Sequence, residues 1–217
     1  MEPEFWQQRW RDNLIGFHQP DVNLHLEQFW PELPLDDDDT VFVPLCGKSR
    51  DMLWLAQYHP VLGVEVSPIA VEAFFEENEL EAERSEEGAF EVFECENIRV
   101  LCGDVFDLKA EQLSHVRAVY DRASLIALPP EMRTQFAQHL DAVLPREVEM
   151  LLVTLDYPQD RMDGPPFSVS AGEVLELFGS GWSIEHMFED DVLAREVKFQ
   201  ERGLTYMTEN VFRLRRG

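Results

Sequence analysis

Cysteine is scarce in this sequence, and long apolar runs are absent. The three cysteines among the 217 residues, Cys46, Cys95 and Cys102, show no Cys-x-x-Cys spacing and no paired histidines, which argues against a disulfide framework or a zinc site. We therefore expect buried, reduced thiols and no bound metal. No apolar run approaches the roughly 18 residues of a membrane span, and no basic-then-apolar signal opens the chain. These absences predict a cytoplasmic protein.

Basic residues are also few. Lysine and arginine number 18 against 43 aspartates and glutamates, which gives a formal net charge of −25. A field this negative repels phosphate backbones and anionic lipids, so the charge predicts that neither nucleic acid nor a membrane is a partner. The hydrophobic content of 45% is ordinary for a globular chain, and 217 residues can bury a sizeable core. We expect one soluble domain over residues 1–217, acting as a monomer.

The segment from Thr40 to Ser67 has the pattern of a strand, a tight loop, a helix and a second strand. An apolar run at 41–43 precedes a loop that contains Gly47, helical spacing follows over 51–58, and a second apolar run ends near Glu65. This pattern is typical of parallel strands joined by a crossover helix. The loop after the first strand and an acid at the tip of the second then face one crevice, where the acid can accept hydrogen bonds from a ribose diol.

Glycine is nearly missing from this loop. A dinucleotide site usually shows three glycines, whereas only Gly47 is present, eighteen residues before Glu65 and close to the spacing of about 20 expected for a ribose-binding acid. A nucleoside without phosphates needs fewer close backbone approaches than a pyrophosphate. We therefore favour an adenosyl ligand such as S-adenosylmethionine over NAD, FAD or ATP. An ordinary strand–helix turn, with Glu65 as a solvated strand end, fits the local pattern equally well.

Other candidate positions also have two interpretations. Trp10 lies in an apolar-periodic segment, 3–15, which is either a lid over the ligand or a cover for one edge of the core. Asp104 follows an expected strand, where its carboxylate can accept a bond from an adenine amino group and the adjacent Val105 can pack on the ring. Asp104 is as readily explained as a helix cap or an Asx-turn.

Arginines stand at two further places of interest. Arg122 ends an expected strand, where a guanidinium can bind a methionyl carboxylate or a substrate anion, or can form an Asp121–Arg122 surface pair of little value. Arg202 lies between the last two expected strands and is predicted to return to the same edge of the sheet. The segment 156–170, with several prolines and Gly164, is predicted to be a stiff loop that forms a substrate wall.

The remaining elements follow from periodicity and from breakers. Residues 81–88 are acidic and polar and are predicted to be a loop. The other expected helices are 24–30, 68–78, a segment from Pro130 up to Pro145, and 171–178. The other expected strands are 90–93, 98–101, 118–122, 148–155, 182–188 and 204–214. The last two of these strands are expected to form an antiparallel pair.

Several motifs together resemble the bacterial form of the thiopurine S-methyltransferase family over nearly the whole chain. They are VPLCGKSRDMLWL, GVEVSPIAVEAFF, YDRASLIALPP, MR and GPPFSV. The resemblance implies an α/β, single-domain, Rossmann-like class I methyltransferase. Its sheet would be mostly parallel and seven-stranded, with an antiparallel C-terminal strand and helices on both faces. Residues 1–35 would form an N-terminal helical lid over a core at 40–217.

The resemblance also implies positions in a site that binds S-adenosylmethionine. Trp10, Leu45, Glu65 and Arg122 match cofactor-contacting positions, and Asp104 and Val105 match the adenine-contacting segment more in position than in residue type. Phe17 and Arg202 match the acceptor side. The implied reaction is an in-line displacement by an aromatic or heterocyclic thiol, acidic enough to need no dedicated base, with Arg122 or Arg202 stabilising the anionic acceptor.

Two alternatives share the same cofactor residues. The first is a related methyltransferase for selenium or tellurium oxyanions, halide or thiocyanate, which a panel of acceptors would separate from a thiol methyltransferase. The second is a non-catalytic module that binds S-adenosylmethionine, because a fold alone does not fix a function.

Overall fold

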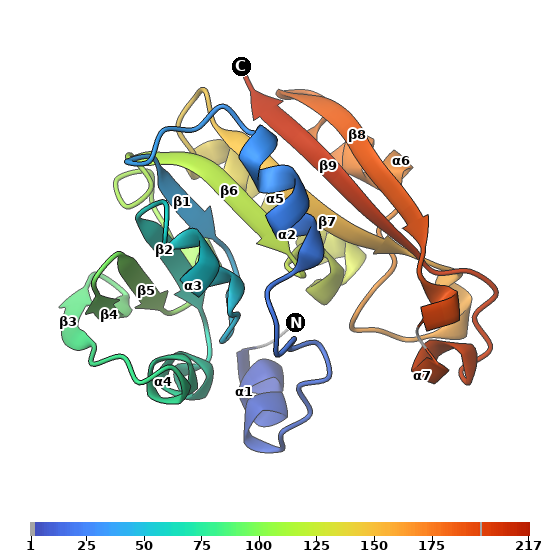
Figure 1. The fold of residues 1–217 in the computed structure, drawn as a ribbon, viewed down its shortest axis with the longest axis horizontal. Helices are drawn as coiled ribbons and strands as arrows, with labels where there is room; N and C mark the ends of the chain where they lie inside the picture. Colours follow the sequence, from blue (N-terminus) through green and yellow to red (C-terminus); the bar gives the residue numbers. More distant parts are fainter. Residues whose placement is uncertain (1–2, 196) are drawn as a thin grey trace. The chain divides into compact units, whose positions relative to one another are not determined.

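The computed structural model of the chain describes residues 3–195 and 197–217, and the course of the chain can be followed in Figure 1. These residues form two compact units. The first contains the described residues up to Tyr120 together with Val143–Pro145. The second contains Asp121–Ala142 and Arg146–Gly217.

Four parallel strands form the centre of the first unit. β1 (Thr40–Val43) lies between β2 (Val61–Glu65) and β6 (Val116–Arg122), and β2 also pairs with β5 (Ile98–Cys102). All five residues of β2 are buried. The sequence pattern predicts a strand–helix–strand unit over Thr40–Ser67, and the parallel pairing of β1 with β2 confirms that prediction.

An antiparallel pair extends this sheet beyond β5, in the order β3-β4-β5-β2-β1-β6. β4 (Phe90–Cys95) pairs antiparallel with β5, so the strands expected at 90–93 and 98–101 form a hairpin. The prediction of a loop at 81–88 is wrong, because Glu83–Glu87 forms β3 and pairs with β4. This edge strand is mostly exposed and charged, so it has no apolar alternation to reveal it. Its stabilisation comes from pairing with β4 and from Arg84, whose guanidinium lies 4.5 Å from the ring centroid of Phe93.

The helices of the first unit begin close to the expected positions, but two end early. α1 covers Pro3–Arg11 instead of 3–15, and Asn13 beyond it adopts a left-handed φ of 54°, a conformation common after helix ends. α3 covers Asp51–Leu55. α4 (Pro68–Glu77) packs against β2 and β5 and also contacts α1. The other helical elements of this unit are α2 (Leu24–Phe29), η1 (Trp30–Glu32) and η2 (Val105–Asp107).

The second unit is built on a three-stranded antiparallel sheet. β9 (Thr208–Arg216) pairs on one side with β7 (Glu149–Asp156) and on the other with β8 (Trp182–Asp191). The antiparallel pairing of the last two strands confirms the prediction. α6 spans Ala171–Phe178 as expected, and α5 spans Pro130–Val143. The shorter helices are η3 (Leu125–Ala127), η4 (Gln159–Arg161), η5 (Leu193–Arg195) and α7 (Val197–Gln200).

The described residues contain nine strands, so the expectation of seven is too low. The strands predicted from the sequence pattern already include eight of the nine, and β3 is the one missed. The class of fold, α/β with parallel central strands, agrees with the prediction. Within the described part of the chain, every helix is too short or too polar to cross a bilayer.

Candidate functional site

Glu65 is the last residue of β2 and is almost completely buried, with 6% of its surface exposed. Its Oε2 accepts a hydrogen bond from the backbone N–H of Gly47 at 2.9 Å, and its Oε1 accepts one from Ser67 at 2.8 Å. Burial raises the pKa of Glu65 from 4.5 to about 7, although these N–H groups lower it. The interpretation of Glu65 as a solvated strand end is therefore wrong.

The loop after β1 turns sharply toward Glu65. Leu45 and Gly47 have positive φ angles of 46° and 53°, and the N–H of Cys46 donates to the carbonyl of Val64 at 3.0 Å. Gly47 has a second constraint, since a Cβ placed there would lie 3.1 Å from Cζ2 of Trp10. The single glycine thus allows both the left-handed turn and the close approach of an indole ring.

Trp10, on α1, is buried, with 9% of its surface exposed. Its ring meets Phe17 edge-to-face, with centroids 5.5 Å apart, and Phe17 also contacts Trp6 at 5.7 Å. Trp10 therefore has the burial expected of a core cover and also adjoins the loop expected to bind the ligand. Phe17, Trp10, Gly47 and Glu65 form one connected series of contacts.

The end of β5 is joined to the same place by the N–H of Gly103, which donates to the carbonyl of Glu65 at 2.9 Å. Asp104 follows and caps η2, with Oδ1 accepting from the N–H of Phe106 at 3.0 Å. The interpretation of Asp104 as a cap is thus confirmed, and the cap leaves Oδ2 outside this bond. Val105 is buried beside it.

The cysteines are free, as predicted, but only Cys46 is fully buried. Burial and the nearby charge of Glu65 raise the pKa of Cys46 well above its ordinary value and that of Cys102 to about 11. Both thiols are therefore protonated at neutral pH. In the described part of the chain, no three histidine, cysteine, aspartate or glutamate side chains converge as metal ligands.

The two candidate arginines belong to the second unit. Arg122 is half-buried at the end of β6. Asp121 beside it is fully buried and accepts from the N–H of Ser124 at 3.0 Å, so the alternative of an Asp121–Arg122 pair at the surface is wrong. Burial raises the pKa of Asp121 from 3.8 to about 7.

Arg202 follows α7 and is exposed. Its Nη1 donates to Sδ of Met162 at 3.0 Å, and its guanidinium lies 5.6 Å from the ring centroid of Phe199. Both partners belong to an apolar cluster that joins the loop after β7 to the segment between β8 and β9. The buried members of that cluster are Tyr157, Met162, Val192, Phe199, Leu204 and Met207.

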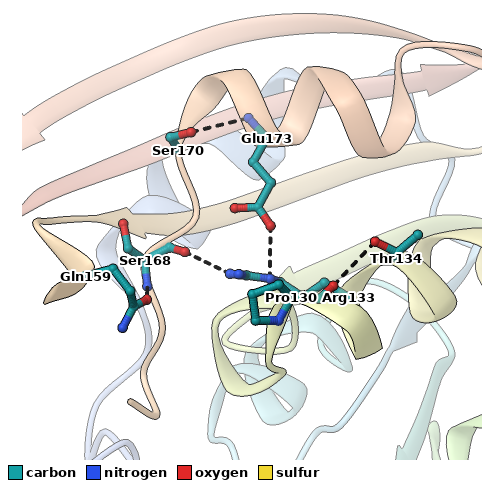
Figure 2. Close-up of polar contacts among 7 residues, drawn as sticks. All are labelled: Pro130, Arg133, Thr134, Gln159, Ser168, Ser170 and Glu173. Atoms are coloured by element: carbon teal, nitrogen blue, oxygen red, sulfur yellow. Dashed lines mark hydrogen bonds and ion pairs between the residues drawn. The ribbon is translucent and has the colours of Figure 1, made fainter. Parts of the chain in front are cut away.

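Arg133, which the sequence analysis missed, is buried on α5 with only 3% of its side chain exposed. Figure 2 shows its guanidinium between Ser168, on the loop after β7, and Glu173, on α6. Nη1 donates to the carbonyl of Ser168 at 2.8 Å, and Nε pairs with Glu173 Oε1 at 3.0 Å. One signal was available, because Arg133 stands three and four residues before the buried Phe136 and Ala137, on the apolar face of its helix.

Solved structures with similar coordinates identify the fold. A methyltransferase from Anabaena variabilis that depends on S-adenosylmethionine matches with a TM-score of 0.68 at 18% identity, covering 99% of this chain and 95% of its own. A TehB-like methyltransferase from Corynebacterium glutamicum matches with a TM-score of 0.56 at 15% identity, covering 99% and 98%. The fold is that of the S-adenosylmethionine-dependent methyltransferases.

The sequence comparisons are more specific. The profile of the thiopurine S-methyltransferase family matches residues 1–217. A thiopurine S-methyltransferase of Nitrosospira multiformis is 49% identical over 215 residues, which cover 99% of this chain and 98% of the relative. One of Pseudomonas entomophila is 50% identical over 217 residues, with full coverage of both. The chain belongs to the thiopurine S-methyltransferase family, which confirms the resemblance seen in its motifs.

Proposed function

We propose that this protein transfers a methyl group from S-adenosylmethionine to the sulfur of a small aromatic or heterocyclic thiol. Membership of the family over the whole chain supports the reaction and the cofactor. The structural observation that supports the proposal most is the buried carboxyl of Glu65, fixed by two backbone N–H groups beside the single-glycine loop. We further propose that the enzyme is a cytoplasmic monomer and that residues 1–35 act as its lid.

The residues of the first unit fit an adenosyl group. Each carboxylate oxygen of Glu65 accepts one N–H, which leaves a lone pair on each for a ribose hydroxyl. Gly47 offers backbone without a side chain, and an edge of the Trp10 indole lies beside it. When bound, the cofactor supplies an activated methyl group on a sulfonium. The proposed cofactor-binding residues are Trp10, Leu45, Glu65, Asp104, Val105 and Arg122.

Each of these side chains has a role that suits its chemistry. The indole of Trp10 attracts a sulfonium through its face and excludes water, Asp104 accepts from the adenine amino group, and Arg122 binds the methionyl carboxylate. On the acceptor side we place Phe17 and Arg202. The guanidinium of Arg202 stabilises an anionic thiolate, so that an acidic aryl thiol needs no separate base.

The decisive experiment combines binding and transfer. S-adenosylhomocysteine at about 100 times its Kd should stabilise the fold by roughly 2.7 kcal/mol. At about 2–4 °C per kcal/mol, the melting temperature should rise by several degrees. Labelled S-adenosylmethionine should then methylate simple aryl thiols. The Glu65→Ala variant should lose roughly 2–3 kcal/mol of cofactor affinity while remaining folded.

Each contrary result has its own meaning. If S-adenosylhomocysteine gave no melting shift, the cofactor assignment would be wrong. Binding without transfer to any acceptor would indicate a non-catalytic module. Transfer to selenium or tellurium oxyanions, halide or thiocyanate, but not to thiols, would overturn the acceptor. If Glu65→Ala bound normally but unfolded readily, Glu65 would be structural.

A further inference from the structure

The loop that follows β7 is held in shape by its own side chains. The side-chain amide of Gln159 forms two hydrogen bonds within the loop. Its Oε1 accepts from the N–H of Ser168 at 2.8 Å, and its Nε2 donates to the carbonyl of Met162. The hydroxyl of Tyr157 donates to the carbonyl of Pro166. A segment this rich in proline therefore has one defined path rather than many.

Arg133 fixes this loop to the helices beside it. Its guanidinium joins the carbonyl of Ser168 to the carboxylate of Glu173, as Figure 2 shows. Burial lowers the pKa of Arg133, and the charge of Glu173 opposes that effect. Loss of either partner would leave a buried guanidinium uncompensated, which is costly, so the hydrogen bond to Ser168 and the ion pair with Glu173 favour one arrangement of α5, α6 and the loop.

The same contacts continue to Arg202. From Arg133 they pass through Ser168 to Gln159, and Gln159 binds the carbonyl of Met162. The sulfur of Met162 then accepts from Nη1 of Arg202 at 3.0 Å. Arg202 is exposed and its long side chain has many rotamers, so the direction of its guanidinium depends on such a contact.

We propose that Arg133 is a positioning residue for the methyl acceptor, acting through the loop after β7 on Met162 and Arg202. The inference rests on the proposed function, because it needs Arg202 to face the acceptor. Arg133 itself touches neither reactant. Its contacts run to the loop and to α6, so its loss should disturb the acceptor and spare the cofactor.

Two variants test this by different means. Arg133→Met removes the anchor, and Gln159→Ala, at an exposed and uncharged position, removes the link between Ser168 and Met162. Each should raise the KM for an aryl thiol by about tenfold or more, since small misplacements near a reacting group are costly. The Kd for S-adenosylhomocysteine should change by less than about twofold. Arg133→Lys, which keeps the charge but not the fork of donors, should recover part of the loss.

The matched control is Thr134→Ala, one residue along α5. Thr134 is exposed and its hydroxyl donates to the carbonyl of Pro130 in its own helix, so both constants should stay unchanged. A lower melting temperature with an unchanged KM for the thiol would show that Arg133 is merely structural and overturn the proposal. Equal weakening of thiol and cofactor would also overturn it. If Arg133→Met fails to fold, Gln159→Ala decides alone.

Failure of the proposed function looks different. In that case the wild-type protein methylates no thiol, and both proposals fall together. A wild-type enzyme that methylates thiols, combined with an unchanged KM in Gln159→Ala, removes only the role of Arg133.

Discussion

At the scale of single residues, the unusual groups are two buried carboxyls, Glu65 and Asp121. Burial raises the pKa of each to about 7. Glu65 has an N–H donor on each oxygen, whereas Oδ2 of Asp121 has no hydrogen-bond partner among the described residues. The cost of ionising Glu65 is explained by the proposed ribose site. Asp121 offers a cleaner test of the cost itself, because its substitution leaves Glu65 untouched.

The variant Asp121→Asn should be more stable than the wild type at pH 8. The folded-state pKa is raised from 3.8 to about 7, so the folded protein holds a proton that the unfolded chain has already released. Stability from this group is therefore lost as the pH rises between these values, by on the order of 4 kcal/mol in total. Asparagine cannot ionise and keeps an oxygen for the N–H of Ser124.

Urea unfolding of both proteins at pH 5 and pH 8 measures the effect. The advantage of Asp121→Asn should be larger at pH 8 than at pH 5 by roughly 2.7 kcal/mol, because pH 5 already lies between the unfolded and folded pKa values of Asp121, while Glu65 contributes equally to both proteins and cancels. If the unfolding free energies of Asp121→Asn and the wild type differed by the same amount at both pH values, the ionisation of Asp121 would not be what destabilises the wild type.

At the scale of elements, α6 connects the acceptor-side loop to the rest of the second unit, and its start is set by one side chain. Oγ of Ser170 accepts from the N–H of Glu173 at 3.3 Å, which makes Ser170 the N-cap. Replacing it with alanine should lower stability by about 0.5 to 1 kcal/mol, the lower part of the usual range because the bond is long. Ser180→Ala, at an exposed position beyond the other end of α6, is the matched control and should be neutral.

Denaturant unfolding of the two variants distinguishes the outcomes. Ser170→Ala should shift the midpoint without changing the slope, since the compactness of either state is unaffected. Equal effects of Ser170→Ala and Ser180→Ala would mean that the cap contributes nothing beyond the loss of a hydroxyl.

Elements with a strong local signal were predictable from the sequence, and those without one were not. The bounds of α6 agree with the prediction because an apolar periodicity ends at a glycine. β3 was missed because its residues face solvent, and only its partner β4 makes it a strand. The helix predicted at 3–15 is longer than α1, because the apolar spacing continues past the left-handed Asn13 into Leu14 and Ile15.

The candidate site divides in the same way. Gly47 and Glu65 could be paired from the sequence, since the strand–helix–strand pattern brings the loop after the first strand and the tip of the second strand to one edge of the sheet. Arg133 could not be connected with its partners, because Ser168 is 35 and Glu173 is 40 residues further along the chain. A single arginine in a helix is ordinarily a surface residue. Its place on the apolar face of α5 could indicate burial, but only the tertiary structure shows which groups it contacts.

At the scale of the whole molecule, the chain has a net charge of −25, so most of its carboxylates cannot be paired with a basic side chain. The acidic groups extend over exposed segments such as Asp36–Asp38 and Glu83–Glu86. Ion pairs exist among them, for example Arg84 with Glu72 at 3.2 Å, but pairs at a surface contribute only about 0 to 1 kcal/mol each. Self-repulsion of the carboxylates should therefore dominate the response to salt.

We expect the melting temperature at pH 8 to rise as sodium chloride is increased from about 0.1 M to about 1 M, because the screening length falls from about 10 Å to about 3 Å. Potassium chloride at equal ionic strength should give the same rise. At pH 5, nearer to the sequence pI of 4.4, the net negative charge is smaller, because a minority of the carboxylates take up protons and histidines become charged, so the rise should be smaller. A melting temperature that falls with salt at pH 8 would mean that the ion pairs, which screening weakens, outweigh the repulsion after all.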